Sequence, residues 1–295
     1  MSEATASEKD LESKDDTEEE NEKDSKDSER APAPSKEAPS GAAAYTRSGS
    51  GMRNIWTIMK REIAAYFNSP VAFILICVTL VGLGGYFFLF EGGVWQQDRA
   101  SMSRLMAFMP WVLCVLTIPL FTMRSLSEEK RMGTIELLIT LPVKDSEVIL
   151  GKYFAALTMV SVQLLLLVAY PVVMFKFPWH MGAFDWNPFW SGILGMLLLS
   201  AAGVAVGIMF SSFTESQILS FFATAFTLTA LFVVGLLVQH FKGMVGDVLA
   251  FFSLQTRYEP FARGLIDTRA VVYFVSIAVF CSLVAFRNLE SRKWK

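Results

Sequence analysis

The sequence is poor in the residues that build catalytic and metal centres. It contains 3 cysteines and 2 histidines among 295 residues. The cysteines lie far apart inside apolar runs, so they indicate neither a disulfide framework nor zinc-ligand spacing. His180 and His240 are isolated, which argues against a histidine-based metal site or catalytic triad. We therefore expect no catalytic residue, no metal and no bound cofactor in this chain, and no nucleic-acid partner.

Charged residues are also scarce outside the amino-terminal segment. They make up 18% of the chain, while 53% of its residues are hydrophobic. Soluble domains hold about 25% charged residues. Residues 1–30 contain 13 Asp and Glu against 5 Lys and Arg, a net charge of −8, and the remaining residues carry +6. This uneven distribution excludes an ordinary soluble enzyme and predicts a membrane protein with a charged tail.

Residues 1–51 are predicted to form a disordered acidic tail. No aromatic residue precedes Tyr45, and such a segment cannot bury enough apolar surface to offset its ordering entropy. The tail lacks the basic and apolar regions of a signal peptide, and its negative charge opposes binding to anionic lipid headgroups. We expect a separate helix over 52–70 and a membrane domain over 71–295.

The predicted helix that ends before Pro70 is amphipathic. Apolar residues from Ile55 to Phe67 recur at helical spacing, and Lys60 and Arg61 fall mostly on the other side. A basic helix with aromatic residues can lie in the plane of the lipid headgroups. Packing on a soluble core is the alternative. We favour the membrane surface because a bilayer-length apolar run follows directly.

Six segments are predicted to cross the membrane as helices, which gives an all-α, polytopic fold. Each is mostly apolar, near the length of about 20 residues that a bilayer requires, and contains no Asp, Glu, Lys or Arg. They are 71–90, 105–123, 154–175, 189–213, 216–239 and 271–286. Pro110, Pro119 and Pro171 predict kinks rather than breaks. Gly203 and Gly207 form a GxxxG sequence that favours close packing within the chain.

Lys and Arg near the span ends predict that both termini face the cytoplasm. With this orientation, the cytoplasmic segments carry 12 such residues and the outer segments carry 7. No ionisable residue lies within a span, which argues against a proton relay or ion-coupled transport. The expected location is the bacterial inner membrane, as a multi-pass protein.

The cytoplasmic loop 124–152 carries the most information. Its first part is charged and predicted to extend the second span into water, and Gly133 is expected to end that turn. Thr134 can cap a following short helix, with Glu136 in its first turn and Pro142 at its end. The loop therefore predicts a compact knob on the cytoplasmic side. A solvated loop with an interfacial anchor is the alternative.

Several motifs together resemble the type-2 ABC exporter permeases, and most nearly their gliding-motility (GldF-like) and nitrous-oxide-reductase-maturation (NosY-like) branch. The resemblance covers residues 52–295, and the acidic tail departs from the family pattern. The motifs are EEKRMGTIELL at 128–138, LPV at 141–143, GK at 151–152, KREIAAYFNSP at 60–70, FARGLID at 261–267 and LESRKW at 289–294.

The resemblance implies a six-helix membrane subunit that pairs with a second copy of itself or a related permease. Each subunit would dock a separate ABC ATPase through a coupling helix in the cytoplasmic loop. The docking residues would be Glu128, Glu129, Arg131, Gly133, Thr134 and Glu136. The amphipathic helix would be the interfacial connecting helix, represented by Trp56, Lys60, Arg61, Glu62 and Tyr66. Residues 241–269 would form short re-entrant or interfacial helices on the far side.

The chain contains no GxxxxGK[ST] sequence, so it lacks the phosphate-binding loop of an ATPase. ATP and magnesium would then be bound by the partner ATPase, and this chain would not be an enzyme. Two other functions stay open. The same architecture could pass mechanical work to a periplasmic auxiliary protein without moving a solute, or the chain could be a passive channel or carrier, although it shows no pore-lining charge.

Overall fold

In the computed structural model, every regular element of the described residues is a helix. The described residues are 51–89, 102–134, 144–176, 186–238, 240–241 and 243–291. The predicted tail, 1–51, falls outside them except for its last residue, Gly51, which begins the first described helix. The all-α prediction is thus confirmed for the described part of the chain.

The first two helices meet at a sharp corner. Helix α2 (Gly51–Asn68) ends directly before Pro70, which begins helix α3 (Pro70–Leu89). The two axes differ by 72°. Proline has no N–H to continue a helical ladder and restricts the residue before it, so the chain turns here as the sequence predicts. Helix α2 has no fully buried residue. Its placement on a membrane surface stays a prediction.

Five helices or helix stacks are long and apolar enough to cross a membrane, and the bent pair of α2 and α3 brings the number to six. Five of the six predicted spans are therefore confirmed as helices suited to crossing a membrane, and the first, 71–90, meets the same criteria only when α3 is counted together with α2. The five are Leu105–Arg131, Asp145–Val173, Trp186–Phe213, Gln217–Val238 and Thr268–Ser291. The last three correspond to α10 (Trp186–Phe213), α11 (Gln217–Val238) and α14 (Thr268–Ser291).

The two spans with proline in their interior are irregular but continuous. The second span consists of α4 (Ser103–Val112), the π-helix η2 (Leu113–Thr117), α5 (Ile118–Thr122) and α6 (Ser127–Arg131). The third consists of α8 (Asp145–Leu166) and α9 (Ala169–Lys176). A widened turn follows Pro110, and a turn separates α8 from the helix that contains Pro171. Both irregularities are local, as expected for kinks.

Helix α10 lies at the centre of the bundle and packs against α4, α5, α8, α11, α13 and α14. Small residues let its neighbours approach closely. A Cβ atom at Gly203 would lie 2.7 Å from Ile118 Cδ1, and one at Gly207 would lie 2.1 Å from Thr122 Oγ1. Both glycines of the GxxxG sequence therefore contact α5 of the same chain, which agrees with the prediction of close packing within one chain.

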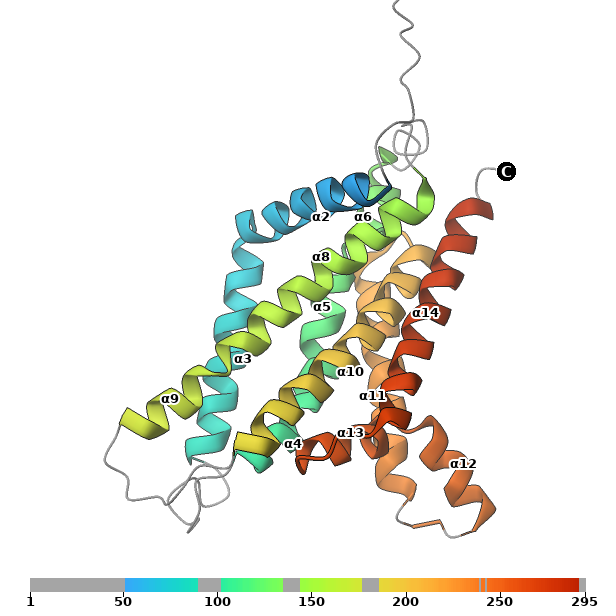
Figure 1. Ribbon diagram of the computed structural model, residues 1–295. Helices are drawn as coiled ribbons and strands as arrows, with labels where there is room; N and C mark the ends of the chain where they lie inside the picture. The colour runs from blue at the N-terminus through green and yellow to red at the C-terminus, as the bar shows by residue number, and fades with distance from the viewer. Residues whose placement is uncertain are drawn as a thin grey trace, which may run out of the picture. The chain divides into compact units, whose positions relative to one another are not determined.

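The helices have two distinct ends (Figure 1). Helices α2 and α6 lie at one end, together with the beginning of α8 and the carboxy-terminal end of α14. Two short helices, α12 (Met244–Phe252) and α13 (Leu254–Ala262), lie at the other end. Tyr258 of α13 donates a hydrogen bond to the Met106 carbonyl at 2.8 Å, which fixes α13 against α4. Residues 244–262 therefore form two short helices, and their placement as re-entrant or interfacial helices on the far side stays a prediction.

Gly207→Ala should destabilise the bundle, because its Cβ would overlap the Thr122 side chain and force α5 away from α10. Overpacking of this kind costs about 1–3 kcal/mol. Gly85→Ala is the matched control, since a Cβ there meets nothing within 4 Å and alanine is the better helix former. Thermal unfolding of the detergent-solubilised protein measures both. Equal melting temperatures for the two variants would contradict close packing at Gly207.

Candidate functional site

The structure places most of the predicted docking residues together at the end of the second span. Glu128, Glu129 and Arg131 lie on α6, and Gly133 follows with φ of +69°. This left-handed conformation favours glycine and ends the helix, as the sequence predicts. Thr134 donates a hydrogen bond to the Glu129 carbonyl at 3.3 Å. Glu136, the sixth predicted docking residue, lies outside the described residues.

Helix α6 is too short to be stable alone. Neighbouring helices supply the additional hydrogen bonds that hold it in place. Its acidic residues stand in the first turn and its basic residues in the last, as the helix dipole favours. The first N–H groups bond to a side chain from another helix. Ser211 Oγ of α10 accepts from the backbone N–H groups of Leu126 and Ser127, both at 3.0 Å. The amino-terminal cap of α6 is therefore provided by α10.

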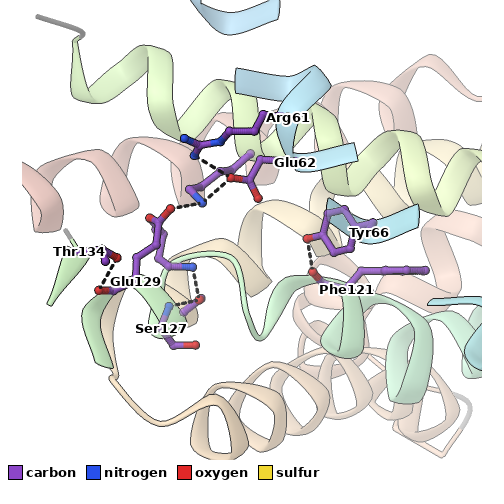
Figure 2. A network of polar contacts seen from close by, with 10 residues as sticks. Arg61, Glu62, Tyr66, Phe121, Ser127, Glu129 and Thr134 are labelled. Carbon is purple, nitrogen blue, oxygen red and sulfur yellow. Dashed lines mark hydrogen bonds and ion pairs between the residues drawn. The ribbon is translucent and has the colours of Figure 1, made fainter. Parts of the chain in front are cut away.

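Lys152 joins three helices through two ion pairs. Its Nζ atom lies 3.1 Å from Glu62 Oε1 of α2 and 2.9 Å from Glu129 Oε1 of α6, while Lys152 itself is on α8. Figure 2 shows the two carboxylates meeting at this ammonium group from different helices. Only 3% of Lys152 is exposed. A buried ammonium needs such partners, so the pairs hold α2, α6 and α8 in one arrangement.

A second polar cluster connects α6 with α10 and α14. Lys130 is buried, and its Nζ atom donates a hydrogen bond to the Ser212 carbonyl. The Asn288 side chain of α14 donates to the same carbonyl and also to Ser212 Oγ, the latter at 3.1 Å. Helix α6 thus has polar contacts on two sides. One side faces α2 and α8, and the other faces α10 and α14.

The predicted residues of the connecting helix divide into two groups. Glu62 and Tyr66 contact the bundle, whereas Trp56, Lys60 and Arg61 are exposed. The Tyr66 hydroxyl donates to the Phe121 carbonyl of α5 at 2.7 Å (Figure 2). Burial raises the pKa of the Tyr66 phenol, and the nearby Glu62 carboxylate acts in the same direction. The phenol is therefore a neutral hydrogen-bond donor that fixes the end of α2 on α5.

Close packing joins the beginning of α2 to α8. A Cβ atom at Gly151 would lie 2.7 Å from Ile58 Cγ2, so the two helices cross with little space between them. The Asn54 amide donates to Glu147 Oε2 at 2.9 Å, and the same oxygen accepts from the Lys144 N–H at 3.3 Å. Helix α2 therefore contacts α8 through both apolar and polar groups.

Sequence reasoning missed the buried polar residues that hold α6 in place. Lys152 appeared only as part of a motif, and Lys130, Ser211, Ser212 and Asn288 were not selected as site residues. One signal was available: Lys152 stands two residues before a predicted span, where a lysine that does not reach water requires an anionic partner. The described residues contain no group of three or more His, Cys, Asp and Glu side chains that could hold a metal ion.

Lys152→Met should destabilise the protein, because the Glu62 and Glu129 carboxylates would face each other without a cation. Loss of one partner of a buried ion pair costs about 3–5 kcal/mol. Adding Glu62→Gln and Glu129→Gln to this variant should restore most of the loss, measured by thermal unfolding in detergent. Arg263→Met is the control, since its pair with Glu259 is exposed and worth at most about 1 kcal/mol. Similar loss in both single variants would argue against the Lys152 link.

The sequence matches one family, described as ABC-2 family transporter protein, over residues 5–279. No individually curated protein matches the chain. The family match begins within the acidic tail, earlier than the 52–295 over which the motifs resemble the family. It agrees with the five to six helices suited to crossing a membrane. The chain therefore belongs to the ABC-2 family of transporters, whose membership implies a multi-pass membrane protein in lipid and an ABC ATPase partner.

Proposed function

We propose that this chain is the permease subunit of an ABC transporter and that a separate ABC ATPase drives it through the segment after α6. The single observation that carries the proposal is the pair of Lys152 contacts, which joins α6 to both the connecting helix α2 and the third span. A force on α6 would reach these helices directly, because the Lys152 ammonium is buried and a relative shift would separate it from its two carboxylate partners.

The docking surface would be the exposed turn 131–134. All four of its residues are exposed, and the apolar Met132 side chain has 58% of its surface exposed. The residues immediately before this turn are held inside the protein by Lys130 and by the serine cap from α10. A partner protein could bind this exposed turn, and because α6 is held by its neighbours, movement of the turn would be transmitted to the adjacent helices. Glu136 would extend this surface beyond the described residues.

We further propose an orientation in the membrane, a subunit arrangement and a branch of the family. The end that carries α2, α6 and the end of α14 would face the cytoplasm of a bacterial inner membrane, with the tail and the carboxy terminus on that side. A second copy, or a related permease, would complete the transport unit. We place the chain in the gliding-motility or nitrous-oxide-reductase-maturation branch on its motifs, with a periplasmic auxiliary protein as a further partner.

A mechanical transmitter that moves no solute is the second candidate. Its support is the lack of charged residues in the predicted spans and a hydrogen bond between two buried polar side chains of neighbouring spans. Gln163, fully buried in the third span, donates to Thr117 Oγ1 of the second span at 3.2 Å. Such groups hold helices together rather than coordinate a charged cargo. A lipidic cargo agrees with the same observations.

Cysteine labelling tests the orientation. After Cys77, Cys114 and Cys281 are replaced by alanine, Thr134→Cys should react with a membrane-impermeant maleimide only in permeabilised cells. Arg269→Cys, on the exposed first turn of α14 at the opposite end, should react in intact cells. The reverse pattern would place α6 outside the cytoplasm, where no ATPase could reach it.

Charge reversal on the docking turn tests the coupling. Arg131→Glu, and separately Glu136→Lys, should lower co-purification of a co-expressed cognate ABC ATPase at least about tenfold, as loss of one or two charged interface contacts predicts. Membrane insertion and yield should be unchanged. Arg263→Glu is the matched control, because it reverses an exposed arginine directly after α13, at the opposite end. Equal ATPase recovery with all three variants would exclude docking at this turn.

A further inference from the structure

A cavity of about 370 Å³ lies in the angle between α2 and α3. Residues of α5, of α6 and of the turn between them also line it, together with Lys152 of α8. The cavity lies beside the polar network of Figure 2 and borders both Glu62 and Glu129. Its lining changes character from one end to the other, from ionised groups to aliphatic side chains.

The polar end contains charges that the protein does not fully match. Lys152 is paired with Glu62 and Glu129, yet Glu129 Oε2 is buried and accepts no hydrogen bond within the described part of the chain. Arg124 and Glu128 also line the cavity, and neither makes an ion pair with another described residue. An exposed guanidinium and a half-buried carboxylate, neither of them paired within the described residues, therefore line one cavity.

The other end of the cavity is apolar and reaches the level at which the first span begins. It is lined by Ala65, Val71, Ala72, Leu75 and Leu120. Val71, in the first turn of α3, is exposed on the surface that would face lipid. A ligand that fills the whole cavity must therefore be amphiphilic, with a charged head beside α6 and an apolar chain beside α3.

We propose that this cavity binds a zwitterionic phospholipid whose headgroup carries a primary ammonium, which goes beyond the transport function proposed above. The ammonium would donate to the Glu128 carboxylate, and the phosphate would accept from Arg124. A quaternary ammonium could not donate to Glu128. An anionic lipid would leave the Glu128 carboxylate unmatched, and the two cations beside the site, Arg124 and Lys152, disfavour a bare metal ion.

Native mass spectrometry of the full chain in detergent tests the proposal. The protein receives equimolar phosphatidylethanolamine, phosphatidylcholine and phosphatidylglycerol with identical acyl chains. Phosphatidylethanolamine should be retained about tenfold more than either other lipid, as one additional charged hydrogen bond predicts. Equal retention of the three lipids would overturn the proposal. Glycerophosphoethanolamine, the same headgroup without chains, should compete poorly, and strong competition by it would exclude a lipid in favour of a soluble phosphoamine.

Two variants separate the roles of the charged groups. Glu128→Gln should remove most of the preference for phosphatidylethanolamine over phosphatidylcholine and leave phosphatidylglycerol retention unchanged. Arg124→Gln should lower retention of all three lipids, because each carries the phosphate. Arg287→Gln is the matched control, since Arg287 forms an exposed pair with Glu290 at the same end of the molecule. An unchanged lipid preference in Glu128→Gln would overturn the assignment. ATPase docking is tested separately by co-purification. A negative result for lipid binding would therefore not affect the docking proposal.

Discussion

The arrangement of the cytoplasmic end depends on one buried ammonium group. Lys152 cannot stay charged inside the protein without nearby anions, and it obtains them from two different helices. Because both carboxylates approach the same atom, the positions of α2 and α6 are set relative to each other through α8. The trans-cap from Ser211 and the contacts of Ser212 extend this restraint to α10 and α14. A five-residue helix thereby acquires a defined position that its own backbone could not provide.

Much of the fold was accessible from the sequence, because the relevant signals are local. Long apolar runs without charge predicted the spans, and Pro70 predicted the corner between α2 and α3. Glycine at 133 predicted the end of α6, where φ is +69°. The widened turn after Pro110 was predicted only as a kink, because a π-helix depends on packing with neighbouring helices as well as on the proline. The close contact between Gly207 and Thr122, which are far apart in the sequence, likewise could not be predicted from the residues next to either one.

The candidate site was predicted less completely. The acidic and basic residues of α6 and the residues Glu62 and Tyr66 were identified, but the lysine that joins them was not chosen. Pairing between residues 62, 129 and 152 depends on how three helices cross, and helix crossing is set by shape complementarity along whole surfaces. Gly151 shows this dependence, since its missing side chain admits Ile58 and brings α2 close enough for the contact. The periodicity of a sequence does not show how closely two helices approach each other.

The π-helix in the second span has a consequence for the length of that span. Each widened turn contains one more residue than an α-helical turn, and one residue corresponds to about 100° of rotation around the axis. The faces of α4 and α5 are therefore offset from those of a regular helix. Both helices pack against α10, but α4 also packs against α3 and α13 while α5 also packs against α8 and α11. A residue inserted or deleted between Pro110 and Pro119 would thus rotate one half of the span relative to the other.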